Sequence, residues 1–593
     1  MGKNIVITGE GIISAIGNDT ASVLQSLREG KTGIGRMRHL RSTHRELPVG
    51  EVKLSDDEMK AALDIAAECE TSRTVLMGLW AVRQALTDAK VRQAMALRPG
   101  LRVVLVSGTT VGGMDLTERH FGAFLAGHGP TECLKHHDPG SSTQAIADYF
   151  ALFSDYTTIS TACSSAANAL ILGANLIQAG EADIVVAGGS EALSLFHLNG
   201  FRSLMITDTE PCRPFDADRA GLNLGEGAAY VVLESEELAR QTDTPVHAFL
   251  SGYGNACDAF HQTASSDDGE GAFLAMREAL QMAHLQPSDI QYVNAHGTGT
   301  PNNDLSESRA LKRVFGADMP LVSSTKSFTG HATSASGAIE AVISLLALRH
   351  QMVPANLGWN TPMPDGIRPT MGMQDHPLRH VLCNSFGFGG NDTSLVFSLS
   401  KSADFDEPYF KYSEDDIRVL ARVELSSEEE LTDIRRYVKP LETRRMGTLM
   451  KSTLLSSLKA LETAGIASPD AIITGTAWGC LENSERLLQQ IYEEGEEMLK
   501  PTYFMQSTHN TLGSTIAIKT LCHGYNMTYS QGDRSLHWAL RDAHLLLRRG
   551  VCHTVLVGCH DESTPLFRSL MQSLGVTDIP TVHSIAIVLS CGK

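Results

Sequence analysis

The chain has 593 residues, a formal net charge of −19 and a pI of about 5.6, an acidic balance that argues against a surface that binds nucleic acid. Its eleven cysteines include no Cys-x-x-Cys pair, so neither a zinc site nor a disulfide framework is indicated. It has neither an apolar run of roughly 18 residues nor the apolar stretch of a signal peptide, so we expect a cytoplasmic protein without a membrane span.

In chain order, short apolar strands alternate with amphipathic helical stretches. Strand-like segments include "MGKNIVITGEGIISAIG", "LRVVLVSGTTVGG", "ADIVVAGGSEA" and "GAAYVVLES", and helical ones include "RTVLMGLWAVRQALTDA" and "GAFLAMREALQMAHL". This alternation predicts an α/β fold with buried sheets. We expect residues 1–250 and 251–400 to form two halves of one unit.

One cysteine lies where a strand pattern meets a helix pattern. Residues 158–161 suit a strand, residues 166–174 suit a buried helix, and Cys163 lies between them among small side chains. A thiol at a helix N-terminus has a lowered pKa, and a sharp strand-to-helix turn exposes its side chain as a nucleophile. The alternative for this stretch alone is a small cysteine buried in a tight turn.

Three further segments carry polar side chains in glycine-rich surroundings. His296 precedes Gly297 in "YVNAHGTGTPNND", Lys326 and His331 share "VSSTKSFTGHATSASGAIEAV", and "CNSFGFGGNDTSLVF" contains a glycine turn. Taken singly, each has an ordinary structural explanation, such as a hydrogen-bonded loop histidine, a solvated lysine or a tight turn. The "GTGT" sequence lacks the ending of a phosphate loop, and two histidines alone do not make a metal site.

Beyond an acidic linker expected at residues 401–425, the sequence repeats itself weakly. Residues 106–119 ("VSGTTVGGMDLTER") match residues 473–486 ("ITGTAWGCLENSER"), and three other segments match in the same order. Residues 426–593 are therefore predicted to be a shorter second copy of about residues 65–235. No counterpart of residues 250–400 follows it.

Together and in this order, these motifs resemble those of the elongating β-ketoacyl-[acyl-carrier-protein] synthases of the thiolase superfamily. The resemblance covers about residues 1–400 and includes "PCRPFDADRAGLNLGEGAA", where Leu222 replaces a common phenylalanine, and "DAFHQTASSDDGEGAFLAMREAL". It implies a layered αβαβα thiolase-like fold, followed here by a second, partial thiolase-like α/β domain.

The resemblance implies a role for each residue of the set. Cys163 would hold the acyl chain as a thioester, and His296 and His331 would donate N–H groups to the enolate formed when malonyl loses carbon dioxide. The main-chain N–H groups of Cys163 and Phe388 would stabilise the tetrahedral oxyanion. Phe388 would also gate the acyl pocket.

Further positions follow from the same resemblance. Lys326 would orient the loop that bears His331, through a carboxylate such as Asp304 or Glu307. Thr298 and Thr300 would form hydrogen bonds with the pantetheine amides, and Val111 would lie near the acyl pocket. We expect His261 to have a structural role.

The second copy lacks this chemistry. Gly532, or Asp533 after a slip of one residue, falls at the nucleophile position, and no cysteine lies between Cys522 and Cys552. We therefore expect an inactive half that resembles a chain-length factor. It would dock in cis through the strand near residues 525–529 and help shape the acyl pocket with four bulky side chains, Trp478, Tyr503, Phe504 and Met505.

The predicted reaction is decarboxylative Claisen condensation of an acyl-Cys163 thioester with malonyl on an acyl carrier protein, in fatty acid or specialised polyketide or polyene lipid synthesis. No bound cofactor or metal is expected, because the phosphopantetheine arrives on the carrier protein. A homodimer, or an internal pseudo-dimer with the C-terminal domain, is expected. The alternatives are a noncatalytic chain-length partner or scaffold, and a thiolase-type enzyme that uses coenzyme A.

Overall fold

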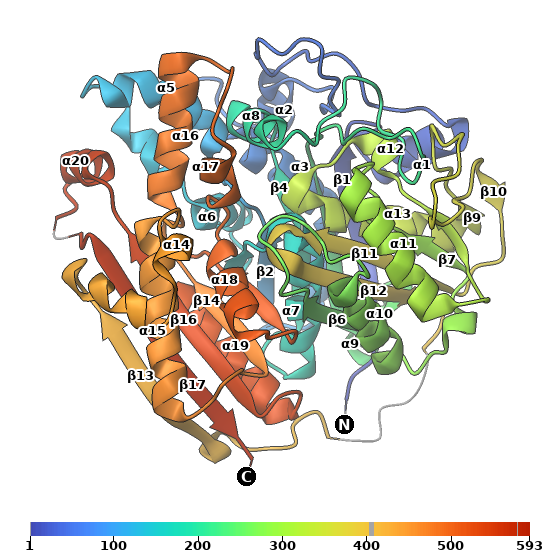
Figure 1. The fold of residues 1–593 in the computed structure, drawn as a ribbon. Helices are drawn as coiled ribbons and strands as arrows, with labels where there is room; N and C mark the ends of the chain where they lie inside the picture. The colour runs from blue at the N-terminus through green and yellow to red at the C-terminus, as the bar shows by residue number, and fades with distance from the viewer. Residues whose placement is uncertain (1, 402–407, 578, 593) are drawn as a thin grey trace.

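The computed structural model describes residues 2–401, 408–577 and 579–592 (Figure 1). In these residues one sheet of 15 strands runs through the molecule, in three successive groups of five. In sheet order the first group is β3 (Asp155–Ile159), β2 (Val103–Gly108), β4 (Ile184–Glu191), β5 (Gly227–Ser235) and β1 (Ile5–Ser14). The second is β6 (Ala248–Cys257), β12 (Asn391–Ser398), β11 (His380–Gly387), β7 (Tyr292–Asn294) and β8 (Leu321–Ser323). The third, on the other side of β3, is β15 (Asn526–Tyr529), β14 (Ala471–Gly475), β16 (Thr554–Glu562), β17 (Val582–Cys591) and β13 (Ile417–Leu425).

The helices follow the same division of the chain. The first part contains α1 (Thr20–Glu29), α2 (Asp56–Ala62), α3 (Arg73–Asp88), α4 (Val91–Leu97), α5 (Met114–Leu125), α6 (Pro139–Phe150), η2 (Ala162–Ser164), α7 (Ser165–Gln178), α8 (Leu195–Ser203) and α9 (Glu236–Thr242). The second contains α10 (Glu270–Met282), α11 (Pro301–Phe315), α12 (Lys326–Thr329), α13 (Ser336–His350) and η5 (Phe388–Gly390), with the short strand pair β9 (Met352–Val353) and β10 (Gln374–Asp375). The C-terminal part contains α14 (Pro440–Thr443), α15 (Thr448–Ala464), α16 (Leu481–Glu494), α17 (Pro501–Met505), α18 (Thr511–Thr520), α19 (Ser535–Arg549) and α20 (Pro565–Ser573).

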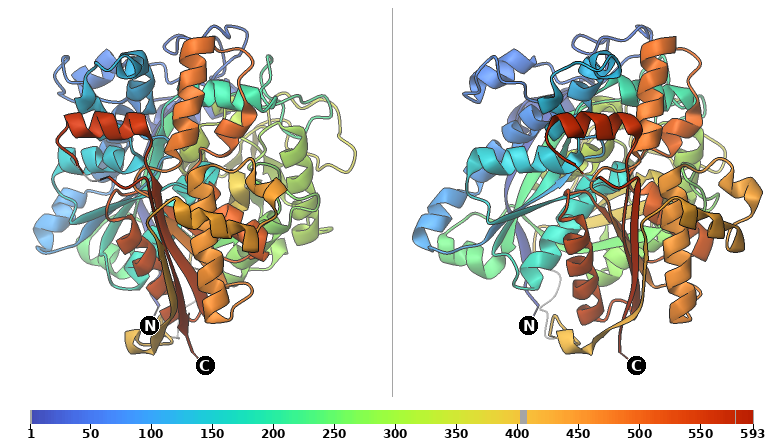
Figure 2. Two further views of the ribbon diagram at one scale, coloured as in Figure 1. Left: turned by 60° about the vertical axis from the view of Figure 1, so that its left-hand side comes forward. Right: turned by 90° about the vertical axis from the view of Figure 1, so that its left-hand side faces the viewer.

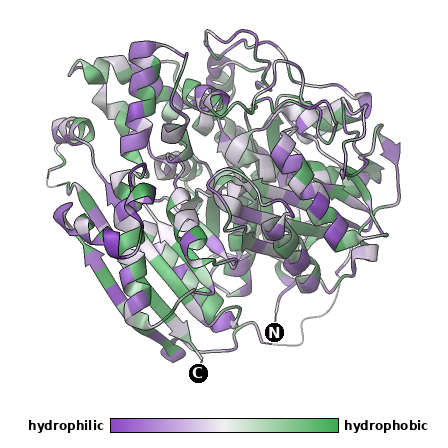
Figure 3. Ribbon diagram, in the orientation of Figure 1, coloured by the Kyte–Doolittle hydropathy of each residue, from purple (hydrophilic) through white to green (hydrophobic). Residues whose placement is uncertain are grey.

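Two buried helices lie between the first and second groups of strands. Every residue of α7 is buried, and so are residues 336–348 of α13, because both helices contact strands of both groups. A helix covered on all sides needs no polar stripe, which explains its run of alanine, leucine and isoleucine. With α3 on the outer face of the first group and α10 on that of the second, the predicted αβαβα layering is confirmed. Figure 3 shows hydrophobic residues concentrated in these inner strands and helices.

The third group repeats the first group of strands with its own helices. Its order β13-β17-β16-β14-β15 matches β1-β5-β4-β2-β3, and α15 and α19 lie on opposite faces of it (Figure 2). Unlike α7, α19 is amphipathic. It buries Trp538, Ala539 and Ala543 but exposes His537. Among the described residues no second sheet covers this helix, so its outer face is polar.

Residues 401–425, the expected linker, are not all linker. Residues 402–407 lie outside the described residues, but Ile417–Leu425 forms β13, which pairs along its length with β17. The acidic residues lie mainly before the strand, whose own sequence IRVLARVEL contains one acid, and most of its side chains are exposed because β13 is at the edge of the sheet. The sheet of the C-terminal part therefore includes residues 417–425.

The two parts of the chain join through the strands that precede the two nucleophile positions. β15 pairs antiparallel with β3 at Tyr529 and Ile159, and main-chain hydrogen bonds flank this pair. Arg534 and Arg541 both form ion pairs with Asp155. The C-terminal part thus lies in cis against the N-terminal unit, as predicted. No helix in the described parts is long and apolar enough to cross a membrane.

Candidate active site

Cys163 lies in a tight turn between a buried strand and a buried helix. β3 ends at Ile159, and η2 leads directly into α7. Ala162 has a φ of 52°, a left-handed conformation that costs a non-glycine residue roughly 1–2 kcal/mol. The Ser165 hydroxyl donates to the Ala162 carbonyl and accepts from the Thr161 N–H at 2.9 Å. The small polar residues around the cysteine therefore stabilise the strand-to-helix turn that the sequence predicts.

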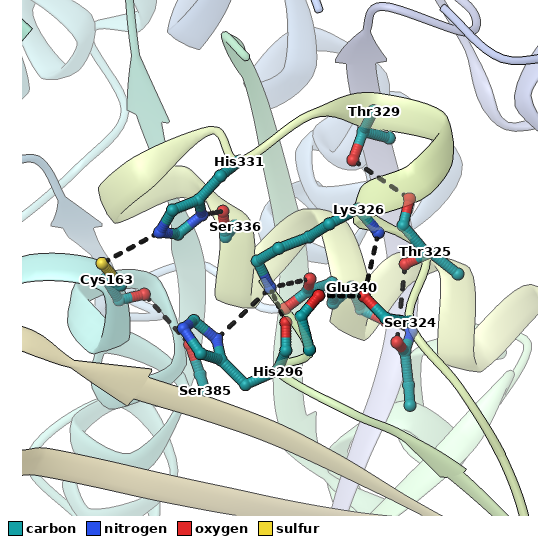
Figure 4. Close-up of polar contacts among 12 residues, drawn as sticks. Cys163, His296, Ser324, Thr325, Lys326, Thr329, His331, Ser336, Glu340 and Ser385 are labelled. Carbon is teal, nitrogen blue, oxygen red and sulfur yellow. Dashed lines mark hydrogen bonds and ion pairs between the residues drawn. The ribbon is translucent and has the colours of Figure 1, made fainter. Parts of the chain in front are cut away.

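The structure brings together the three side chains expected to do the chemistry (Figure 4). His331 Nε2 lies 3.1 Å from Cys163 Sγ, and the rings of His296 and His331 lie 5.4 Å apart, nearly perpendicular. Burial, and next the Lys326 ammonium, holds the pKa of both imidazoles well below the usual range. Both rings are therefore neutral at physiological pH, and each keeps one N–H to donate.

The thiol does not have the lowered pKa expected at a helix N-terminus. Burial raises the pKa of Cys163 to about 11, and the opposing effects of the Lys326 ammonium and of the Phe388 and Cys163 main-chain N–H groups are smaller. Removal from water outweighs the helix dipole because Cys163 is only 4% exposed. Cys163 rests as a thiol, so reaction requires a nearby proton acceptor, and His331 Nε2 is within reach.

Lys326 is held by a carboxylate other than the two expected. Its Nζ forms an ion pair with Glu340 on α13 and donates to His296 Nδ1 at 3.2 Å and to the His296 carbonyl at 2.6 Å. An ammonium has no acceptor, so Nδ1 of His296 must accept and the ring proton lies on Nε2. Burial raises the pKa of Glu340 to about 7. The only sequence signal for this residue is one acid within an otherwise apolar helix.

Asp304 and Glu307 instead stabilise the loop that carries His296. Glu307 accepts from the main-chain N–H groups of His296 and Gly297 at 2.9 and 2.7 Å, and Asp304 accepts from that of Gly299 at 3.2 Å. Both carboxylates lie on α11, and their hydrogen bonds go to the main chain of this loop. The prediction that one of them partners Lys326 is wrong, because the carboxylate that pairs with the lysine comes from α13.

A cavity of about 360 Å³ leads from the surface to these side chains. Its walls include the predicted residues Cys163, His296, His331, Thr298, Thr300 and Phe388. The two threonine hydroxyls are 2.8 Å apart, and the exposed Met205 lies at the mouth. Thr298 and Thr300 therefore line the same cavity as the thiol, and their pantetheine contacts stay a prediction.

A smaller cavity, of about 30 Å³, lies on the other side of Phe388. It is lined by Val111, Cys163 and Phe201, and by Phe504 and Thr508 from the C-terminal part. Phe388 borders both cavities, as a gate between a passage and an acyl pocket would.

Only part of the predicted aromatic contribution from the C-terminal half is present. The ring of Phe504 lies 5.1 Å from that of Phe201 at the small cavity. Trp478 packs instead on Phe567, 4.9 Å away, in a separate cluster. The expectation that Trp478 shapes the pocket is therefore wrong, because its segment turns toward α20.

The C-terminal half contains the same turn as the one around Cys163, but without a nucleophile. Gly532 has a φ of 53°, like Ala162, and the Gln531 N–H donates to Ser535 Oγ at 2.9 Å, as in the first turn. This equivalence places the exposed Asp533 at the nucleophile position, which resolves the one-residue ambiguity in the sequence. A solvated carboxylate cannot form the thioester.

The three reacting side chains lie close enough together to hold a metal ion. One donor atom from each of Cys163, His296 and His331 lies within 4.8 Å of the other two. The buried Lys326 ammonium beside His296 disfavours a second cation there.

The exposed His261 accepts from the N–H groups of Thr263 and Ala264 at 3.2 Å, consistent with the structural role expected for it.

Three sequence profiles match the chain. The family described as "Beta-ketoacyl synthase, N-terminal domain" matches residues 2–239, and "Beta-ketoacyl synthase, C-terminal domain" matches residues 247–360. A second profile described as "Beta-ketoacyl synthase, N-terminal domain" matches residues 421–593, which agrees with the repeat.

Individual relatives agree with the profiles. A protein of Vibrio cholerae serotype O1 named "3-oxoacyl-[acyl-carrier-protein] synthase 2" is 34% identical over 415 residues, 67% of this chain and 99% of that protein. The solved structure titled "The ishigamide ketosynthase/chain length factor" is 29% identical with a TM-score of 0.63, over 68% of this chain and all of that one. The structure titled "PfaC Keto synthase-Chain length factor" is 16% identical with a TM-score of 0.79, over 99% of this chain and 78% of that one, and so shares the fold of both parts. The chain belongs to the beta-ketoacyl synthase family.

Proposed function

We propose that the protein condenses an acyl group on Cys163 with malonyl carried by an acyl carrier protein, with release of carbon dioxide. The observation that carries this proposal is one thiol that contacts a neutral imidazole, His331, with a second, His296, within 4.8 Å, all lining a single cavity. A nucleophile and two N–H donors around one point suit acyl transfer followed by enolate formation.

In the loading step, Cys163 Sγ attacks the carbonyl of the incoming acyl thioester while its proton passes to His331 Nε2. The bond from that carbonyl to the carrier sulfur breaks, and His331 returns the proton to the departing thiolate. The main-chain N–H groups of Cys163 and Phe388 face the sulfur and are suited to donate to the carbonyl oxygen. Each such donor contributes about 3 kcal/mol to stabilising the transition state.

In the second step, the malonyl group loses its carboxylate as carbon dioxide, and the electron pair of the broken bond forms an enolate. The enolate oxygen accepts from His296 Nε2–H, whose position is determined by Lys326, and from His331 Nε2–H in the tautomer whose Nδ1 accepts from the Ser336 hydroxyl. The enolate carbon then attacks the acyl-Cys163 carbonyl, and the sulfur leaves as a thiolate that takes a proton from solvent. No protein-bound cofactor takes part, because the phosphopantetheine comes with the carrier protein.

We infer that the C-terminal half occupies the place of a second synthase subunit and acts as a chain-length partner. It lacks the thiol, since Asp533 replaces it, but contributes Phe504 and Thr508 to the small cavity beside Cys163. A relative titled as a ketosynthase with a chain length factor supports this division of roles.

The test is to incubate the full chain with acyl-loaded carrier protein and malonyl-loaded carrier protein, and to follow carbon dioxide and 3-oxoacyl products by mass spectrometry. We expect both products, with condensation abolished in Cys163→Ala and carbon dioxide release retained there. Condensation of two coenzyme A thioesters without carbon dioxide would favour a thiolase-type reaction. A folded protein that retains no acyl group on Cys163 would favour a noncatalytic scaffold.

A further inference from the structure

The loop that carries Phe388 is a glycine-rich turn. Phe388 lies between Gly387 and Gly389, and Gly389 has a φ of 83°, in the region that favours glycine. Within its own half, the Gly389 N–H donates to the Gln262 carbonyl at 2.7 Å, and the Gly390 carbonyl accepts from the Asp258 N–H at 2.8 Å. The Phe388 carbonyl is left for a donor from elsewhere, and what binds it helps to set the direction of the Phe388 N–H, which faces the Cys163 sulfur.

The C-terminal half holds it directly. Asn510 Nδ2 donates to the Phe388 carbonyl at 2.7 Å, and the N-terminal end of α18 packs against Gly389. A Cβ on Gly389 would lie 2.9 Å from both Asn510 Nδ2 and Ser514 Cβ, so the two halves fit without spare room. The ring of Phe388 also stacks on Phe201 at 5.6 Å.

The repeat shows that this asparagine is a feature of the C-terminal half alone. Ala151 ends α6 and Leu521 ends α18, both left-handed, with the same separation along the chain as the two nucleophile turns. That separation sets Asn510 opposite Gly140, where a Cβ would lie 2.8 Å from the Ser530 carbonyl. The N-terminal unit thus has a glycine, Gly140, at the position from which Asn510 of the C-terminal half reaches across the interface.

The local structure of α18 does not account for an asparagine here. Its side chain makes no capping hydrogen bond to the helix that it begins. Asn510 is 1% exposed, and its Oδ1 has no hydrogen-bond partner among the described residues. Leaving a buried acceptor unpaired is unfavourable, because the acceptor has lost its hydrogen bonds to water. An alanine would avoid this cost, so what the asparagine contributes is its donor to the Phe388 carbonyl.

We propose that Asn510 is a positioning residue for the catalytic centre of the N-terminal unit, and that the site is incomplete without the C-terminal half. By holding the Phe388 carbonyl, Asn510 fixes the main chain at Phe388 and keeps its N–H directed at the point where the oxyanion develops. Asn510 touches no substrate itself. This inference rests on the proposed acyl transfer to Cys163 but not on decarboxylation.

The experiment compares Asn510→Ala with a matched control in the full chain. Gln531→Ala is the control, because Gln531 is also buried at the interface, where its side chain donates to the Gly140 carbonyl at 3.2 Å, but does not contact the Phe388 loop. Acyl loading of Cys163 from an acyl-pantetheine thioester is timed by mass spectrometry. Iodoacetamide alkylation of Cys163, which needs no oxyanion donor, reports whether the nucleophile remains available.

We expect loading in Asn510→Ala to slow roughly 10- to 100-fold, less than the loss on deleting an oxyanion donor outright. KM for the thioester and the alkylation rate should change less than about twofold, and Gln531→Ala should load like the wild type. In Asn510→Asp, loading should recover as pH falls, because a protonated carboxyl regains a donor for the Phe388 carbonyl.

Loading in Asn510→Ala within about twofold of wild type, or an equal loss in Gln531→Ala, would overturn the proposal. If Asn510→Ala does not fold, Asn510→Asp decides alone, and a pH-independent loss there counts against positioning. Suppose that Asn510→Ala slows loading as expected but that the protein releases no carbon dioxide from malonyl-loaded carrier protein. This inference then stands, and the proposed condensation fails.

Discussion

Replacing Glu340 with glutamine tests how the site sets the proton of His296. Glu340 carries the charge that balances Lys326, and Lys326 Nζ lies 3.2 Å from His296 Nδ1. With a neutral glutamine, no carboxylate holds the buried ammonium in place, so its hydrogen bond to His296 Nδ1 is no longer fixed. His296 can then place its proton on Nδ1 and lose the Nε2–H that would face the enolate.

The magnitude follows from burial of the pair. The side chains of Lys326 and Glu340 are 1% and 2% exposed, so breaking the pair should lower the free energy of unfolding by about 3–5 kcal/mol. Loss of one donor to a developing oxyanion lowers a rate by up to about 10²–10³. Acyl loading uses the main-chain donors at Cys163 and Phe388, so it should fall far less than decarboxylation.

The assay is single-turnover release of carbon dioxide from malonyl-loaded carrier protein, with acyl loading of Cys163 measured in parallel. Glu234→Gln is the control. Glu234 is also buried and accepts from the Thr8 hydroxyl at 2.7 Å, but it is not near Lys326. Equal losses of loading and decarboxylation, or an equal loss of decarboxylation in the control, would refute this reasoning.

Three further outcomes are expected. The alkylation rate of Cys163 should climb about tenfold per pH unit from pH 7 to pH 10 without a plateau, because its pKa is about 11 and the thiolate reacts; a plateau near pH 7 would contradict the burial argument. Phe504→Ala should lower the free energy of unfolding by about 3 kcal/mol and lengthen the acyl chains accepted, since Phe504 is 3% exposed and lines the small cavity; an unchanged product profile by mass spectrometry would count against its place in the pocket. Removing residues 401–593 should expose the β3 edge and cause aggregation or a new homodimer, seen by light scattering; a soluble monomer with the same products would show that the C-terminal half is dispensable.

The reacting groups could be predicted because the sequence patterns that mark them are short and lie around the residues themselves. Cys163 lies at a strand-to-helix junction, and His296 and His331 lie in glycine-rich loops next to buried strands and helices. Such turns are encoded by the few residues that form them, so their order along the chain was enough to indicate one site. The layered fold followed for the same reason, since buried strands and helices carry their own periodicity.

The partners of these groups could not be predicted in the same way. Glu340 comes from the middle of an apolar helix and Asn510 from the other half of the chain, and nothing near either residue marks its contact with Lys326 or Phe388. Asp304 and Glu307 follow the His296 motif directly in sequence, yet the carboxylate that pairs with Lys326 is Glu340, 14 residues from the lysine in the other direction along the chain.

The sequence by itself determined which residues can act as nucleophile and N–H donors, the alternation of strands and helices, and the loss of the thiol in the second copy, since each depends on residue type and local pattern. Only the tertiary structure decided that burial raises the pKa of Cys163, that Glu340 rather than Asp304 balances Lys326, and that Asp533 takes the place of the nucleophile. These outcomes depend on which elements pack together and how completely they exclude water. Desolvation and hydrogen-bond geometry are properties of that packing, and no single segment of the chain carries them.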